Sequence, residues 1–204
     1  MKKLITLWAA ALVVLAPLCA KSAKDVRRQA KAAERTLKKE GFKPYDLGSV
    51  SANLETYFQK VDDGCTPILG TSGPCVTENL AKVTALANAA NEYAIMQGGD
   101  VRGRLISEGA NLSGQQMDNL IASFERLIEK NIRGELVPCA SFYKERGGMY
   151  QVRVYCIVDE DAAARARRHA MERALEEQAL AEEYGSQVSD WISEGFDKAS
   201  NRSE

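Results

Sequence analysis

Histidine is almost missing from this chain of 204 residues, which has one, His169, shortly after three arginines. Serine and cysteine hydrolases use a histidine as general base, and zinc sites combine histidines with closely spaced cysteines. The cysteines form C-x9-C and C-x16-C spacings and no C-x2-C pair, which argues against zinc and thioredoxin-like redox chemistry. We therefore predict no catalytic residues, metal or cofactor, and interpret His169 as part of a solvated helix face.

Excess charge is also missing. Lysine and arginine number 27 against 28 acidic residues, and the formal net charge is −1. Nucleic-acid binding is typical of a clustered basic surface, so this balance predicts no nucleic-acid partner. The "GTSG" segment lacks the lysine and the spacing of a phosphate-binding loop. Acidic pairs do occur, as Asp62-Asp63 and Asp159/Asp161, and we expect them to solvate turns or cap helices.

The sequence has one apolar run of note, at residues 4–18, preceded by two lysines. That run is short for a bilayer span and ends before Cys19-Ala20, as in a secretory signal peptide. We predict cleavage after Ala20 and a mature chain that begins at Lys21. Lipidation of Cys19 is the alternative, and the preceding Pro17-Leu18 disfavours it. The expected location is the periplasm or the outer membrane.

The rest of the chain divides into three parts. Residues 21–63 predict an N-terminal helical segment, residues 64–184 an α+β core domain that ends in a long charged helix, and residues 185–204 a short helix with a frayed tail. The clearest helix follows Ser113, which forms a capping box with Gln116. Its apolar stripe puts Leu120 and Phe124 at the expected centre of a helix–sheet interface.

A β-hairpin is predicted at residues 135–146 and 149–158, because Gly147-Gly148 suits a two-residue turn. In this register, facing residues have numbers that sum to 295. One face then carries mainly apolar side chains: Val137, Cys139, Ser141, Tyr143, Tyr150, Val152, Val154, Cys156 and Val158. The opposite face is wetter, with Phe142 and Tyr155 as exceptions.

The same register puts Cys139 opposite Cys156 on a non-hydrogen-bonded rung, where side chains come closest. In an oxidising compartment this predicts a disulfide, which would stabilise the fold by on the order of 3 kcal/mol. The alternative is two reduced thiols that act as small core groups. Cys65 and Cys75 are a weaker pair, since they need a tight turn at residues 70–73.

The fold class that follows is α+β. We expect a small antiparallel sheet, made of the hairpin plus residues 68–76, to be covered on one face by the helices at 78–97 and 114–130. Long charged helices at residues 23–40 and 162–184 have narrow alanine-based seams. They either pack on the domain or pair with another protein.

One segment carries a resemblance to a known family. "GTSGPCVTENLAKVTALANAANEYA", followed by a helix and a hairpin, resembles small bacterial outer-membrane lipoproteins of about twenty kilodaltons and related exported proteins of Gram-negative anaerobes. The matching positions are Gly70, Ala81, Lys82, Ala85, Leu86 and Ala89. The resemblance implies an envelope α+β domain without established catalytic residues.

These features predict a non-enzymatic exported envelope protein with a structural or interaction role. Its expected partner is another envelope protein or a second copy of the chain, bound through the terminal helices. We expect contact with the membrane only by peripheral association or through a lipid anchor. Two alternatives stay open. One is binding of a small hydrophobic or cell-wall-derived ligand in the helix–sheet interior, and the other is a hydrolase with paired carboxylates.

Overall fold

The computed structural model describes residues 23–45, 49–181 and 184–185. The predicted signal peptide, Cys19 and residues 186–204 of the predicted C-terminal segment lie outside these ranges. The elements in chain order are α1 (Ala23–Lys39), β1 (Lys43–Pro44), α2 (Val50–Asp62), β2 (Thr66–Thr71), α3 (Glu78–Ser107), α4 (Gly114–Ile132), β3 (Val137–Arg146), β4 (Met149–Val158) and α5 (Glu160–Glu177).

Four antiparallel strands form one sheet in the order β1-β3-β4-β2, which confirms the α+β prediction. Gly147 and Gly148 join β3 to β4 with φ values of 61° and 73°, the left-handed pair that a tight hairpin turn requires. The predicted third strand is β2, next to β4. The fourth strand, β1, was not predicted, because two residues carry no strand pattern; they pair with Tyr143 and Phe142.

The hairpin keeps its predicted register from the turn as far as Ala140, which faces Tyr155. The register then shifts between Pro138 and Ala140, and Pro138 faces Cys156. The predicted rung that joins Cys139 to Cys156 is therefore wrong: Cys139 is the extra residue of a β-bulge. A shift by one residue also reverses the faces beyond it, which explains why Val137 is 49% exposed instead of buried.

The first sheet face packs against the N-terminal half of α3. Gly70 of β2 makes this approach possible, since a Cβ there would lie 2.0 Å from the Ala85 carbonyl oxygen and 2.8 Å from the Ala89 Cβ. Thr77 caps α3 by accepting a hydrogen bond from the Leu80 amide at 3.2 Å. The alanines at the centre of the family resemblance thus form a close helix–strand contact.

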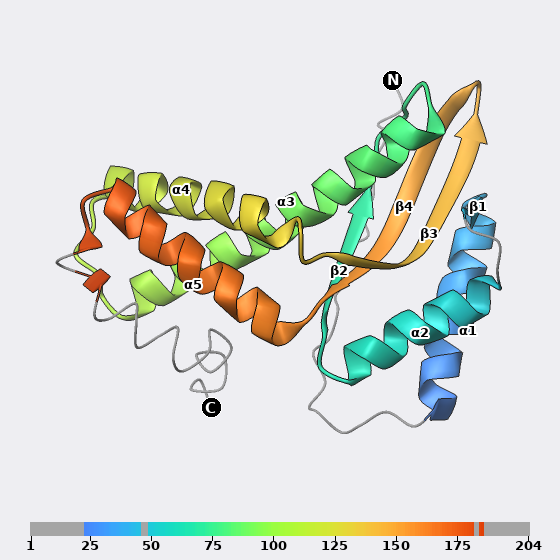
Figure 1. The fold of residues 1–204 in the computed structure, drawn as a ribbon, viewed down its shortest axis with the longest axis horizontal. Helices are drawn as coiled ribbons and strands as arrows, with labels where there is room; N and C mark the ends of the chain where they lie inside the picture. The colour runs from blue at the N-terminus through green and yellow to red at the C-terminus, as the bar shows by residue number, and fades with distance from the viewer. Residues whose placement is uncertain (1–22, 46–48, 182–183, 186–204) are drawn as a thin grey trace, which may run out of the picture.

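The α3 helix continues beyond the sheet and then lies beside α4 and α5 (Figure 1). The sequence predicted a helix only as far as about residue 97, but α3 continues through the following glycine-rich segment to Ser107. Gly98 lies against Glu125 of α4, and a Cβ would meet that carboxylate at 2.2 Å. The glycine therefore permits close helix packing there.

The predicted capping box of Ser113 and Gln116 is present at the start of α4. Leu120 and Phe124 are buried as predicted, with exposed fractions of 1% and 0%. Their expected location at a helix–sheet interface is wrong, because α4 packs mainly between α3 and α5. An amphipathic stripe predicts burial, but it does not say which element covers it.

The second sheet face is also covered, by α1 and α2, which corrects the prediction of a one-sided sheet (Figure 1). The two aromatic exceptions on this face explain the difference. Tyr155 lies edge-on to Phe142 at 5.7 Å and to Tyr57 of α2 at 5.2 Å between ring centroids. Together with Leu37 and Leu54 they belong to a second, smaller core.

Among the helices in the described part of the chain, none is both long enough and apolar enough to span a membrane.

Candidate functional site

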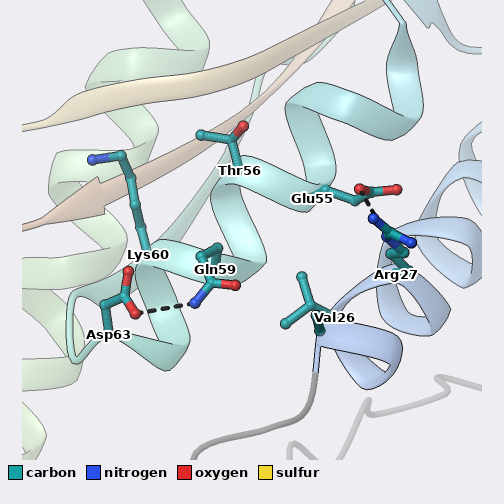
Figure 2. Close-up of a pocket in the computed structure, with 8 residues that line it drawn as sticks. Val26, Arg27, Glu55, Thr56, Gln59, Lys60 and Asp63 are labelled. Atoms are coloured by element: carbon teal, nitrogen blue, oxygen red, sulfur yellow. Dashed lines mark hydrogen bonds and ion pairs between the residues drawn. The ribbon is translucent and has the colours of Figure 1, made fainter.

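A groove between α1 and α2 is the first hollow that could hold a small molecule (Figure 2). Its volume is about 480 Å³ and it is broadly open to solvent. Arg27 and Glu55 approach to 3.8 Å across it, and Gln59 donates to Asp63 at 3.1 Å. Its polar side chains bond to one another instead of converging on a common point. This geometry favours a hydrated surface groove over a ligand pocket.

A second hollow, of about 240 Å³, lies between the end of α4 and α5 and includes His169. The Asn131 amide nitrogen lies 3.1 Å from His169 Nδ1. Donation by the amide fits the neutral imidazole with its proton on Nε2. His169 is exposed, as the sequence predicted. Asn131 and the nearby Glu135 and Arg165 do not form a nucleophile–base pair with it.

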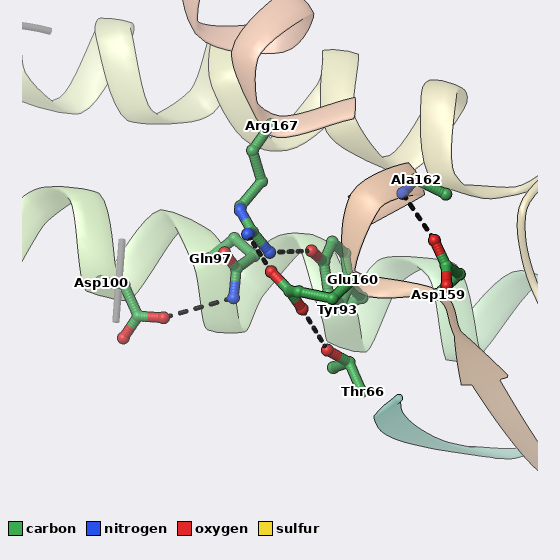
Figure 3. A network of polar contacts seen from close by, with 8 residues as sticks. All are labelled: Thr66, Tyr93, Gln97, Asp100, Asp159, Glu160, Ala162 and Arg167. Carbon is green, nitrogen blue, oxygen red and sulfur yellow. Dashed lines mark hydrogen bonds and ion pairs between the residues drawn. The ribbon is translucent and has the colours of Figure 1, made fainter. Parts of the chain in front are cut away.

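A buried arginine of α5 belongs to a polar network that connects α5, α3 and β2 (Figure 3). Arg167 of α5 is 4% exposed and forms an ion pair with Glu160. It also donates to the Tyr93 hydroxyl of α3 at 2.9 Å, and Thr66 of β2 donates to the other Glu160 oxygen at 2.9 Å. Hydrogen bonds to Glu160 and Tyr93 satisfy a charge that would otherwise be costly to bury. The network holds α5, α3 and β2 in fixed relation.

The sequence interpretation missed Arg167, since it assigned this whole arginine cluster to a solvated surface. Arg165 and Arg168 are exposed, but Arg167 is not. Helical spacing contained the signal: Ala163 precedes Arg167 by four residues, Met171 follows it by four, and both are fully buried. An arginine at that phase lies on the packed face of its helix.

The described cysteines, Cys65, Cys75, Cys139 and Cys156, are free thiols in this structure. Cys156 is buried in the larger core, where desolvation raises its pKa to about 12. Cys139 is half-buried near Lys60 and Cys65, and burial also raises its pKa. The thiolate is the nucleophilic form, so raised pKa values are the opposite of what a reactive cysteine needs. Cys75 lies instead on an isolated bridge to Tyr150.

The acidic residues marked in the sequence have local roles. Asp159 caps α5 by accepting from the Ala162 amide at 3.2 Å, and Asp63 accepts from Gln59. Burial against α3 raises the pKa of Glu125, while Arg102 opposes the shift. Within the described ranges, no group of three histidine, cysteine or acidic side chains is arranged to hold a metal ion.

Apolar side chains are exposed at the start of α3. Leu80 and Val83 lie three residues apart on the first turns of α3, and Val76 lies just before the cap residue Thr77; the exposed fractions of Val76, Leu80 and Val83 are 67%, 48% and 57%. We call these three residues the α3 apolar surface. Leu69 of the neighbouring strand β2 is also exposed, at 45%. Clustered exposed apolar groups on a rigid helix are typical of a protein-binding surface.

Comparison of the chain with family models, curated proteins and solved structures found no match. The resemblance to outer-membrane lipoproteins remains a prediction from the sequence. The exposed surfaces described above are therefore the basis for assigning a function.

Proposed function

We propose that this chain is an exported cell-envelope protein that acts by binding a second envelope protein and has no enzymatic role. The observation that carries the proposal is the α3 apolar surface, which is exposed while the interior behind it is filled. A partner that covers Val76, Leu80 and Val83 would remove apolar area from water at about 25 cal/mol per Å². The rigid strand–helix contact at Gly70 holds this surface in one conformation.

The terminal helices support a different role from the one expected of them. The apolar seam of α1 packs on α2 and the smaller core, and the alanine face of α5 packs on α4. Since both seams are used inside the molecule, we assign partner binding to α3. The two hollows described above are broadly open to solvent, so they favour this role over a ligand-binding one.

Photocrosslinking in intact cells tests the proposed contact. A photoreactive amino acid at position 83 should give one discrete adduct with a second protein, and Leu80→Glu should abolish it. Ile106 is the matched control, because it is equally apolar, 65% exposed and at the other end of the same helix. No adduct at position 83, equal adducts at both positions, or an adduct with twice the chain's own mass would each contradict the proposal.

Export is tested separately. Protein recovered from the envelope should begin at Lys21 when its N-terminus is sequenced. A terminus blocked by lipid at Cys19 would move the protein to the lipoprotein class, whereas an intact Met1 would contradict export.

A further inference from the structure

The α1 helix carries a basic surface that the overall charge balance conceals. Its exposed side chains include seven cations, which we call the α1 basic face: Lys24, Arg27, Arg28, Lys31, Arg35, Lys38 and Lys39. The helix contains two acidic residues, Asp25 and Glu34, so its net charge is +5 in a chain whose total is −1. The remainder of the chain is therefore net acidic, so positive charge is concentrated on α1 and negative charge predominates elsewhere.

Helical geometry places these cations on one side. At 100° per residue they fall within an arc of about 120°, opposite the buried Val26, Ala30 and Leu37. At 1.5 Å per residue, the row from Lys24 to Lys39 is about 22 Å long. The helix lies at the edge of the molecule and packs on α2, which crosses in front of it in Figure 1. The row is straight, convex and open to solvent.

Most of this charge is not neutralised. Arg28 pairs with Asp25 at 3.1 Å and Lys38 with Glu34 at 2.7 Å, and both cations remain more than half exposed. Arg27 meets Glu55 only at 3.8 Å. Lys24, Lys31, Arg35 and Lys39 form no ion pair with another described residue, so a long-range attraction for anions remains.

We infer that the α1 basic face binds an anionic lipid surface. A planar array of head groups matches a straight convex row of cations, each of which contributes about 1 kcal/mol near an anionic bilayer. The face contains no aromatic side chain for base stacking and is not a groove, which disfavours single-stranded nucleic acid.

The contact is expected to be peripheral. The buried side of α1 is committed to the smaller core, so the helix has no free apolar face to insert into the acyl region. Binding should then depend on charge and ionic strength alone. This surface lies across the sheet from the α3 apolar surface, and it uses none of the residues of the proposed protein contact.

Vesicle co-sedimentation of the full chain tests the inference. The test variant combines Lys24→Gln, Lys31→Gln, Arg35→Gln and Lys39→Gln, which removes four unpaired cations while helix propensity is kept. The control combines Lys130→Gln, Arg146→Gln, Arg165→Gln and Arg168→Gln. These four are also exposed and form no ion pair with a described residue, so the change in net charge is the same but is scattered over the surface.

Vesicles of phosphatidylglycerol and phosphatidylcholine in a 1:3 ratio are compared with pure phosphatidylcholine in about 0.1 M salt, where the Debye length is about 10 Å. At about 1 kcal/mol for each of the four cations, the partition ratio between the two lipid mixtures should fall roughly a thousandfold in the α1 variant and less than threefold in the control. Any binding through the apolar run is common to every variant and cancels in this ratio. Raising the salt to about 1 M should abolish the preference of the wild type.

Three results would overturn the inference. The first is equal binding of the wild type to both lipid mixtures, and the second is an equal loss in the two quadruple variants. The third is tighter binding to a fluorescent DNA duplex than to anionic vesicles at the same salt, which would assign the face to nucleic acid. Loss of photocrosslinking at Val83 would leave this vesicle assay unchanged, so the two proposals fail independently.

Discussion

The two faces of the sheet are covered in different ways. On the first face, valines of β4 pack with Cys156 against α3 in a continuous core that extends through α4 and α5. On the second, α1 and α2 cover a few side chains, and polar residues of the sheet contribute as well. The Arg153 guanidinium lies 4.6 Å from the Phe42 ring centroid and pairs with Glu40 at 2.9 Å. The α1–α2 layer is therefore held both by apolar packing and by charged side chains that lie against aromatic rings.

This difference has a consequence for dynamics. Local opening costs less where few apolar side chains are buried, because the free energy of opening follows the buried contacts. We expect the α1–α2 layer to open without unfolding the larger core. The layer that can separate most easily is also the one that carries the α1 basic face.

The largest effect is expected at the contact between β2 and α3. Gly70→Ala places a Cβ against the backbone oxygen of Ala85, which cannot move without shifting α3. The free energy of unfolding should fall by about 4 kcal/mol or more, measured by denaturant titration. Gly73→Ala is the control, since no atom lies within 4 Å of its added Cβ, and it should change stability by less than about 1 kcal/mol. Equal effects at both glycines would contradict the close contact.

The next largest loss of stability is expected from shortening a core side chain between α3, α4 and α5. Phe124→Ala removes a fully buried ring from the larger core and should cost about 3–5 kcal/mol in global stability. Ile106→Ala, at an exposed position, should stay within about 0.5 kcal/mol of wild type. If the unfolding midpoint of Phe124→Ala matched that of wild type, the stripe of α4 would not be a core.

The comparison of the two layers is tested most directly at α1. Leu37→Ala removes a side chain that is 1% exposed in the smaller core and should cost about 2–3 kcal/mol, the lower part of the range for such changes. Hydrogen exchange should show lost protection of amides in α1 and α2, with protection in α3 to α5 retained. Loss of protection throughout the chain would show that both layers unfold as one unit.

A decline in stability is expected at alkaline pH, and it is small just above pH 9. Burial raises the pKa of Cys156 from 9.0 to about 12, and it also raises the pKa values of Tyr57 and Tyr155 above 10.0. Above pH 9 the unfolded chain releases these protons before the folded chain does, so stability is full below pH 9 and decreases toward pH 12. Unfolding titrations at several pH values measure the slope.

A variant and a chemical probe test whether the buried Cys156 thiol contributes to this decline of stability with pH. Cys156→Ala should have a shallower decline than wild type between pH 9 and pH 12, whatever its stability at neutral pH. In native protein at pH 8, iodoacetamide should modify the partly exposed Cys75 and leave Cys156 intact. Rapid alkylation of Cys156, or identical slopes in variant and wild type, would contradict its burial as a protonated thiol.

Local sequence chemistry determined much of this fold. The capping box at Ser113, the Asp159 cap and the Gly147-Gly148 turn are all where the sequence predicts them. These features depend on a few neighbouring residues, so pattern and backbone preference suffice to predict them. The apolar stripe of α4 predicted burial in the same way.

Only the tertiary structure decided how those elements combine. A bulge at Cys139 shifted the register and separated the predicted cysteine pair; the adjacent Pro138 is typical of bulges and strand edges, but a proline alone does not fix where the extra residue falls. Burial of Arg167 depends on Tyr93, 74 positions away, and on Glu160. The α1 basic face likewise follows from packing, since balanced composition cannot show that one helix turns its apolar side inward and all seven cations outward. Sequence spacing fixes the side of a helix on which a residue lies; long-range packing fixes what that side meets.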